Sequence, residues 1–75
     1  MSYTIRERAR RKSEVHAHIQ HHPGESLATL PHFLSMQATL GGVNADTVLT
    51  YITELLAEKL IEVRDGRIYP AEARP

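Results

Sequence analysis

The pattern of apolar and polar positions predicts three helices followed by a short β-hairpin. The first helix, over about residues 4–21, is rich in Arg, Glu, Ala and Lys, which favour helices, and a Pro-Gly pair ends it. Its apolar stripe is thin and consists of Val15 and Ile19, with His22 at one end and Ile5 further back. The first half is polar on almost all sides, so we expect it to extend beyond the core.

A second helix is predicted to begin at Pro31 and to end at the glycine pair 41–42. Proline fits the first position of a helix, and glycine tolerates the left-handed conformation that often ends one. The preceding residues 26–30 (SLATL) alternate over too short a length to distinguish a brief strand from a loop. The face of this helix that meets the core is predicted to carry Leu30, Phe33, Met36 and Leu40.

The third helix, over residues 44–60, has the most distinct pattern. Asn44 is a good N-cap, and Asp46 suits the positive end of the helix dipole. Tyr51 is predicted at the border between two faces. The apolar face carries Val48, Leu49, Ile52, Leu55, Leu56 and Leu60, and the opposite face carries Asp46, Thr47, Thr50, Thr53, Glu54 and Ala57.

Residues 61–70 (IEVRDGRIYP) predict a hairpin whose two-residue turn is Asp65-Gly66. An Asp-Gly pair between alternating residues favours this turn, because both positions need positive φ. The turn places Arg64 directly opposite Arg67, and two like charges in that position are unfavourable. The sequence leaves two explanations open: either both arginines lie in open solvent, or an anion holds them together.

After these elements, the chain resembles the winged helix-turn-helix superfamily of prokaryotic regulators. Residues 46–70 (DTVLTYITELLAEKLIEVRDGRIYP) contain a recognition-helix pattern T-V-x-x-Y-I-x-x-L, followed by E-K-x-I at the start of the hairpin. The expected fold class is therefore mainly α with a small β-hairpin, a three-helix winged helix-turn-helix. The expected organisation is a basic helical arm over 1–12, this domain over 13–70 and a frayed tail over 71–75.

The resemblance implies a DNA-binding protein, most simply a transcriptional regulator. The third helix would enter the major groove of double-stranded DNA, and the hairpin, or wing, would contact the backbone or the minor groove. Carried over to this chain, the contacts from the helix would be Asn44, Thr47, Thr50, Tyr51 and Thr53, and those from the wing Arg64 and Arg67.

The uneven distribution of charge along the chain adds residues to the expected DNA contacts. The 75 residues carry nine basic and nine acidic side chains, yet residues 1–24 hold five of the basic and only two of the acidic ones. A basic segment of this kind is typical of an arm that meets a polyanion. From it we add Arg6, Arg10 and Arg11 to the residues expected at DNA phosphates.

The third helix itself favours a competing interpretation. Helices that read base edges usually carry Arg, Lys, Asn or Gln on the face that meets DNA, whereas the polar face of this helix carries threonines with Asp46 and Glu54 and neither Lys nor Arg. The alternative is a winged-helix module for protein–protein contact that does not bind DNA. An RNA-binding winged helix is a third interpretation that the sequence does not separate from the first.

The remaining chemistry narrows the function further. There is no cysteine, no nucleophile–base constellation and no glycine-rich phosphate loop, so we expect no enzyme activity and no cofactor. His18 and His22 have a spacing that can chelate a metal, but no acidic ligand accompanies them in a recognisable spacing, and no metal site is predicted.

Hydropathy indicates the expected cellular location, and length indicates the expected oligomeric state. No apolar run is long enough to cross a membrane, so a cytoplasmic protein is expected. Chains below about 70–80 residues often need additional support, and a homodimer would supply it.

Overall fold

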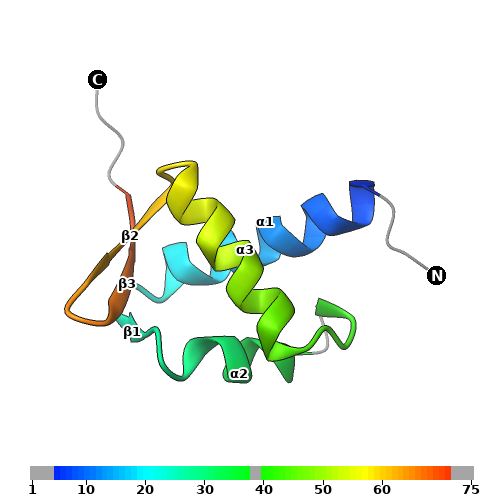
Figure 1. Cartoon of the computed structure of the whole chain (residues 1–75), viewed down its shortest axis with the longest axis horizontal. Helices are drawn as coiled ribbons and strands as arrows, with labels where there is room; N and C mark the ends of the chain where they lie inside the picture. Colours follow the sequence, from blue (N-terminus) through cyan, green and yellow to red (C-terminus); the bar gives the residue numbers. More distant parts are fainter. Residues whose placement is uncertain (1–4, 38–39, 72–75) are drawn as a thin grey trace.

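A computed structural model describes residues 5–37 and 40–71 of the chain (Figure 1). Within them lie three helices and three strands, and the strands form one antiparallel sheet in the order β1-β3-β2. The fold class predicted from the sequence, mainly α with a small hairpin, is confirmed. The elements in chain order are α1 (Ile5–His21), β1 (Glu25–Ser26), α2 (Leu30–Ser35), α3 (Ala45–Ala57), β2 (Ile61–Arg64) and β3 (Arg67–Pro70).

The core lies where α3 crosses α1 and α2, and the sheet closes one end of it (Figure 1). Each of the three helices and two of the strands contribute apolar side chains, as does the connection before α3. These residues are Val15, Ile19, Leu30, Leu34, Leu40, Val43, Val48, Tyr51, Ile52, Leu55, Ile61 and Ile68.

Helix α1 confirms the thin stripe, because Val15 and Ile19 are buried while Ile5 is 90% exposed. Its N-terminal half projects past α3 in Figure 1. The same half nevertheless contains a buried side chain, Arg11, which is 7% exposed. The helix runs without a break across residue 12. The predicted boundary between the basic arm and the domain at this residue therefore stays a prediction.

Helix α2 differs from its prediction in both length and orientation. It begins at Leu30 and ends at Ser35, well before the glycine pair. It buries Leu30, Pro31 and Leu34. Of the predicted core face, Leu30 and Leu40 are buried, whereas Phe33 and Met36 are 46% and 70% exposed, so the prediction was wrong at these two positions. On a helix, a stripe spaced by four (Leu30, Leu34) and a stripe spaced by three (Leu30, Phe33, Met36) can each form a face. The packing against α3 buries the first.

Helix α3 begins as predicted, because the Asn44 side chain accepts a hydrogen bond from the Thr47 backbone N–H at 2.8 Å. It ends at Ala57, earlier than expected. Its buried face is also rotated from the predicted one, because Tyr51 is 1% exposed and belongs to the core. Leu49, Leu56 and Leu60, placed in the apolar face by the sequence, are 43%, 36% and 42% exposed.

The wing has the predicted register, with Arg64 paired to Arg67 across a turn in which Asp65 and Gly66 have φ of 52° and 72°. Strand β1 adds a short third strand on the other side of β3. Backbone bonds from Gly24 N–H to Ile68 O at 2.7 Å and from Leu27 N–H to Gly66 O at 2.8 Å continue this pairing to the turn. The stretch predicted as strand or loop is therefore both, with Ser26 in β1 and a turn after it.

Candidate nucleic-acid interface

The two wing arginines are both exposed, and each has its own neighbour. The Arg64 guanidinium lies 4.3 Å from the centre of the Tyr69 ring, and its Nε is 3.3 Å from Glu62 Oε1. Arg67 Nη1 donates a hydrogen bond to Gly24 O at 2.8 Å. The cost of placing two like charges opposite each other is therefore reduced by neighbours within the chain, without an anion. Their outer surfaces still face solvent and can meet one.

The N-terminal half of α1 supplies a second group of cations. Some of them are exposed and others are buried or paired with α3. Arg6 and Arg10 are exposed, and their contact with phosphate stays a prediction. Arg11 is not available at the surface, because it packs beside Gly41, where an added Cβ would lie 2.9 Å from Arg11 Nη2. Its predicted contact with phosphate therefore does not agree with its burial.

Two further α1 cations are bound to α3. Arg8 contacts Glu54 through both guanidinium Nη atoms, at 3.1 and 2.5 Å. Lys12 Nζ contacts Glu54 Oε1 at 3.2 Å and Glu58 Oε2 at 2.5 Å. The hydrogen bond from Arg8 lowers the pKa of Glu54, and the hydrogen bond to Glu58 raises the pKa of Lys12. This ion-pair network joins the two helices and neutralises both acids.

The network predicts a stability that falls at both ends of the pH range. A lowered pKa means that Glu54 stabilises the fold above the ordinary carboxyl value of 4.5, and that this contribution is lost as the pH falls through the folded pKa. Lys12 contributes below the ordinary lysine value of 10.5 and loses its contribution as the pH rises through its raised pKa. Thermal unfolding followed by circular dichroism should show a plateau between these values.

The variant Glu54→Gln should flatten the acid side of that profile. Because these groups are partly solvated, we expect a small change, one that added salt reduces further. Glu62→Gln in the wing is the matched control and should retain the acid dependence of the wild type. An unchanged acid side in Glu54→Gln would contradict the assignment.

Helix α3 presents an exposed face without Lys or Arg between the wing and the N-terminal half of α1. Thr50 Oγ1 donates to Asp46 O at 3.0 Å and Thr53 Oγ1 donates to Leu49 O at 2.9 Å, so both hydroxyl protons are used within the helix. Their oxygens can still accept hydrogen bonds. The exposed residues of the helix are Asp46, Leu49, Thr50, Thr53, Leu56 and Ala57.

Three more residues of the helix were predicted to contact DNA, and the structure gives each of them a different degree of exposure. Tyr51 is 1% exposed, and the Arg8 guanidinium lies 5.3 Å from the centre of its ring, so it faces α1 and not solvent. Its predicted contact with DNA does not agree with this burial. Asn44 is exposed, although its side-chain oxygen is used in the cap, and Thr47 is half-buried beside it.

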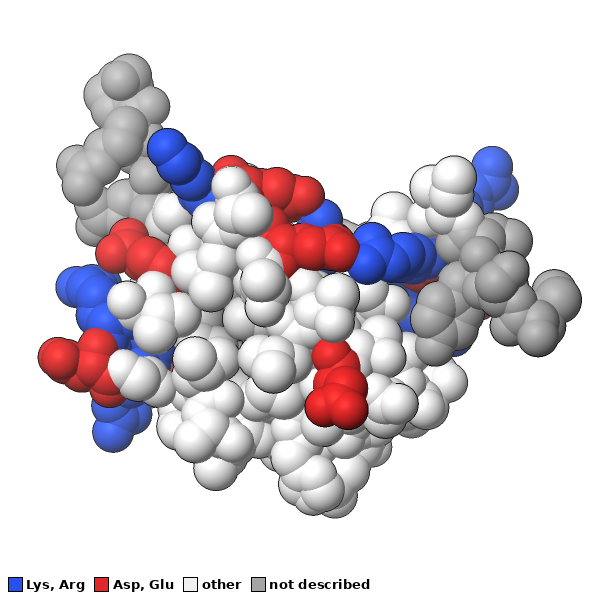
Figure 2. All heavy atoms as spheres, viewed as in Figure 1, with Lys and Arg blue, Asp and Glu red and all other residues white. Residues whose placement is uncertain are grey.

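Taken together, the exposed cations lie at two ends of the molecule. Figure 1 places the wing at one end and the N-terminal half of α1 at the other, with α3 between them. Figure 2, from the same side, shows Lys and Arg side chains at both ends, and uncharged or acidic side chains over the middle. Arg64 and Arg67 are paired across the hairpin, whereas Arg6 and Arg10 belong to the N-terminal half of α1.

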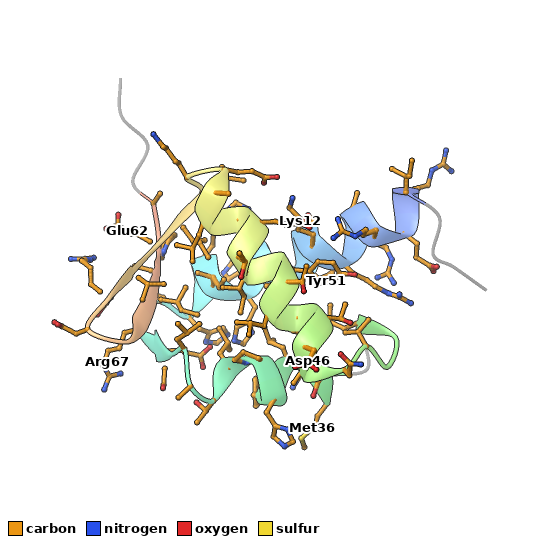
Figure 3. All side chains as sticks on the ribbon, viewed as in Figure 1. Lys12, Met36, Asp46, Tyr51, Glu62 and Arg67 are labelled. Atoms are coloured by element: carbon orange, nitrogen blue, oxygen red, sulfur yellow. The ribbon has the colours of Figure 1, made fainter. Side chains whose placement is uncertain are left out.

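The contact between Glu54 and the two α1 cations was missed in the sequence. The partners are 46 and 42 residues apart in the chain, so no local spacing indicates them. Figure 3 shows Lys12 next to the upper end of α3. The one available signal was global, since the basic first part of the chain and the acidic remainder are complementary.

The histidines form a small cluster without metal-site geometry. His18 Nε2 and Glu25 Oε1 are 2.5 Å apart, and the rings of His18 and His22 are 4.6 Å apart. In the described part of the chain, no group of three or more His, Cys, Asp or Glu side chains could hold a metal ion. These contacts instead join the end of α1 to β1.

The element order and the sheet define a winged-helix-like fold, with three helices and a small antiparallel sheet that ends in a hairpin. No family model, no curated protein and no solved structure matches the chain, so the fold stands on its own geometry. Among residues 5–37 and 40–71, no helix has the length and apolar character needed to span a membrane.

Proposed function

We propose that the protein binds double-stranded DNA as a winged-helix protein of the transcriptional-regulator type. The observation that supports this most is the placement of exposed cations at two ends of the molecule, in the wing and in the N-terminal half of α1 (Figure 2). A duplex laid along the exposed face of α3 would meet Arg64 and Arg67 at the wing. Arg6 and Arg10 lie on the side of α1 opposite to Arg8, so they would contact phosphates only beyond the end of that face. Phosphate neutralisation by such groups supplies most of the sequence-independent affinity of DNA-binding proteins.

In this arrangement α3 lies at the major groove but contributes little charge. Thr50 and Thr53 offer hydroxyl oxygens to backbone donors or base amino groups, and their methyl groups suit the methyl of thymine. Asp46 repels phosphate, which restricts how deeply this end of the helix can approach. We therefore expect binding that depends mainly on the wing and α1, with modest discrimination among sequences.

The direct test is binding to random-sequence duplex DNA, measured by fluorescence anisotropy over a series of salt concentrations. We expect measurable affinity at low salt and a linear fall of log affinity with log salt, with a slope of about 0.9 for each phosphate contact. Arg6→Ala/Arg10→Ala should lower that slope by about two. No binding at the lowest salt concentration would overturn the proposal.

A second candidate function, protein–protein contact, is favoured by one specific observation. The exposed face of α3 carries Leu49 and Leu56, 43% and 36% exposed, and the helix has neither Lys nor Arg. Apolar side chains surrounded by polar ones are typical of protein interaction surfaces. Leu49→Ser would weaken a complex that survives nuclease treatment, while leaving the salt slope of DNA binding unchanged.

A further inference from the structure

Among the described residues, strand β2 has one edge that no other strand covers. It is an outer strand of the sheet, whose order is β1-β3-β2 (Figure 1). Leu60 O accepts a hydrogen bond from Ala71 N–H at 3.0 Å, and bonded and non-bonded pairs alternate along an antiparallel ladder. The pairing of Ile61 and of Val63 with β3 is therefore of the non-bonded kind. Their N–H and C=O groups point to the uncovered edge.

The side chains of β2 alternate between the two faces of the sheet. Ile61 is buried and Val63 packs against the core, so Glu62 and Arg64 project on the opposite face. Arg64 Nε lies 3.3 Å from Glu62 Oε1 within the strand, and the two side chains are 63% and 46% exposed. This contact uses one guanidinium nitrogen and one carboxylate oxygen, so each group can also bind a second partner.

We propose that β2 pairs antiparallel with β2 of a second copy of the chain, about a two-fold axis at Val63. In this register the Val63 residues of the two copies exchange two backbone hydrogen bonds. Glu62 of each copy lies directly opposite Arg64 of the other. The two sheets then form one continuous sheet. This inference goes beyond the proposed DNA binding and does not depend on it.

The charges of β2 favour this register over its alternatives. A two-fold contact uses the same surface on both copies, so the strand must be complementary to itself. An antiparallel register centred at Glu62 places the two copies of Glu62 opposite each other, and a parallel in-register pairing does the same. Like charges directly opposite destabilise a sheet, whereas opposite charges stabilise it. Of these three pairings, the one centred at Val63 alone joins opposite charges.

The test is an exchange of charges, followed by sedimentation velocity at high protein concentration without DNA. We expect a weak dimer for the wild type, because one short strand of each copy forms the contact. Glu62→Arg and Arg64→Glu should each weaken this dimer about tenfold, since each change makes both cross-strand pairs repulsive. Circular dichroism melts would confirm that both variants are folded.

An equimolar mixture of these two variants should recover the dimer, because Glu62→Arg then faces only acids and Arg64→Glu only cations. The contact within one strand is restored in neither chain, so recovery reports the pairing between copies. The matched controls, Asp46→Arg and Lys59→Glu, have the same net charges but lie at exposed positions outside β2. Each should keep the wild-type dimer, and mixing them should change it little. An equal loss in the controls, reversed on mixing, would show that net charge alone governs association and would overturn the proposal.

The absence of cysteine from the chain provides a second measurement, which leaves the charges of β2 intact. In a single-cysteine variant any disulfide must join two copies. Val63→Cys, at the proposed axis, should form disulfide-linked dimers under mild oxidation faster than Ala28→Cys, although Ala28 is the more exposed position. A wild type that is monomeric at all concentrations would overturn the proposal. So would a mixture without recovery, or equal rates of cross-linking.

Discussion

Replacing Arg64 and Arg67 together with alanine is expected to weaken DNA binding more than any other change to the wing. If each arginine neutralises one phosphate, the slope of log affinity against log salt should fall by about two. The fold should tolerate the change, because it also removes two like charges that face each other across the hairpin. Circular dichroism melts of both proteins would check this before the anisotropy titrations are compared.

Two control variants make this result specific. Lys59→Gln removes an exposed cation outside the wing tip and should leave the salt slope nearly unchanged. Arg64→Lys/Arg67→Lys keeps both charges and should retain most of the slope, while losing the stacking on Tyr69 and the bond to Gly24 O. A double alanine variant that binds with the wild-type slope would show that the wing does not contact DNA.

The largest expected effect on stability comes from Tyr51. Tyr51→Ala should lower the free energy of unfolding by about 3–5 kcal/mol, because it empties a large space in the core between α1 and α3. A chain of 75 residues has a total stability of only about 4–11 kcal/mol. Urea unfolding followed by circular dichroism should therefore show a variant that is largely unfolded or close to it.

Tyr51→Phe separates the ring from its hydroxyl. The hydroxyl is buried and has no hydrogen-bond partner among the described residues, so removing it should leave stability unchanged or raise it by about 1 kcal/mol. DNA affinity should also be unchanged. A loss of DNA affinity at wild-type stability would restore the role at DNA that the sequence suggested for this residue. A loss of stability would instead show that the hydroxyl has a partner.

Local signals in the sequence predicted the parts of the fold that depend on neighbouring residues. The hairpin register follows from the Asp65-Gly66 turn, and the start of α3 follows from the Asn44 cap, because both are fixed within a few residues. The rotation of α3 was not predictable in this way. A tyrosine at the border of an apolar face can lie in solvent or against another helix, and only packing against α1 decides between them.

In the candidate site too, features set by neighbouring residues were predictable and features set by long-range contacts were not. The exposure of Arg64 and Arg67 could be anticipated, because residues at a hairpin tip face solvent. The contacts of Arg8 and Lys12 and the burial of Arg11 could not be anticipated. They depend on Glu54, Glu58 and the turn at Gly41, which are all distant in the chain. A basic run indicates a cationic surface, but long-range contacts determine which of its members reach that surface.

The way the wing is attached has a consequence for the thermodynamics of binding. A free two-stranded hairpin would lose much conformational freedom on meeting a ligand, and that loss would oppose binding. Here Leu27 N–H is bonded to Gly66 O at the turn itself, and Arg67 is bonded to the carbonyl of Gly24. The wing is thus already ordered before any partner arrives, so the entropy of ordering its backbone is met during folding and little of it remains to oppose association.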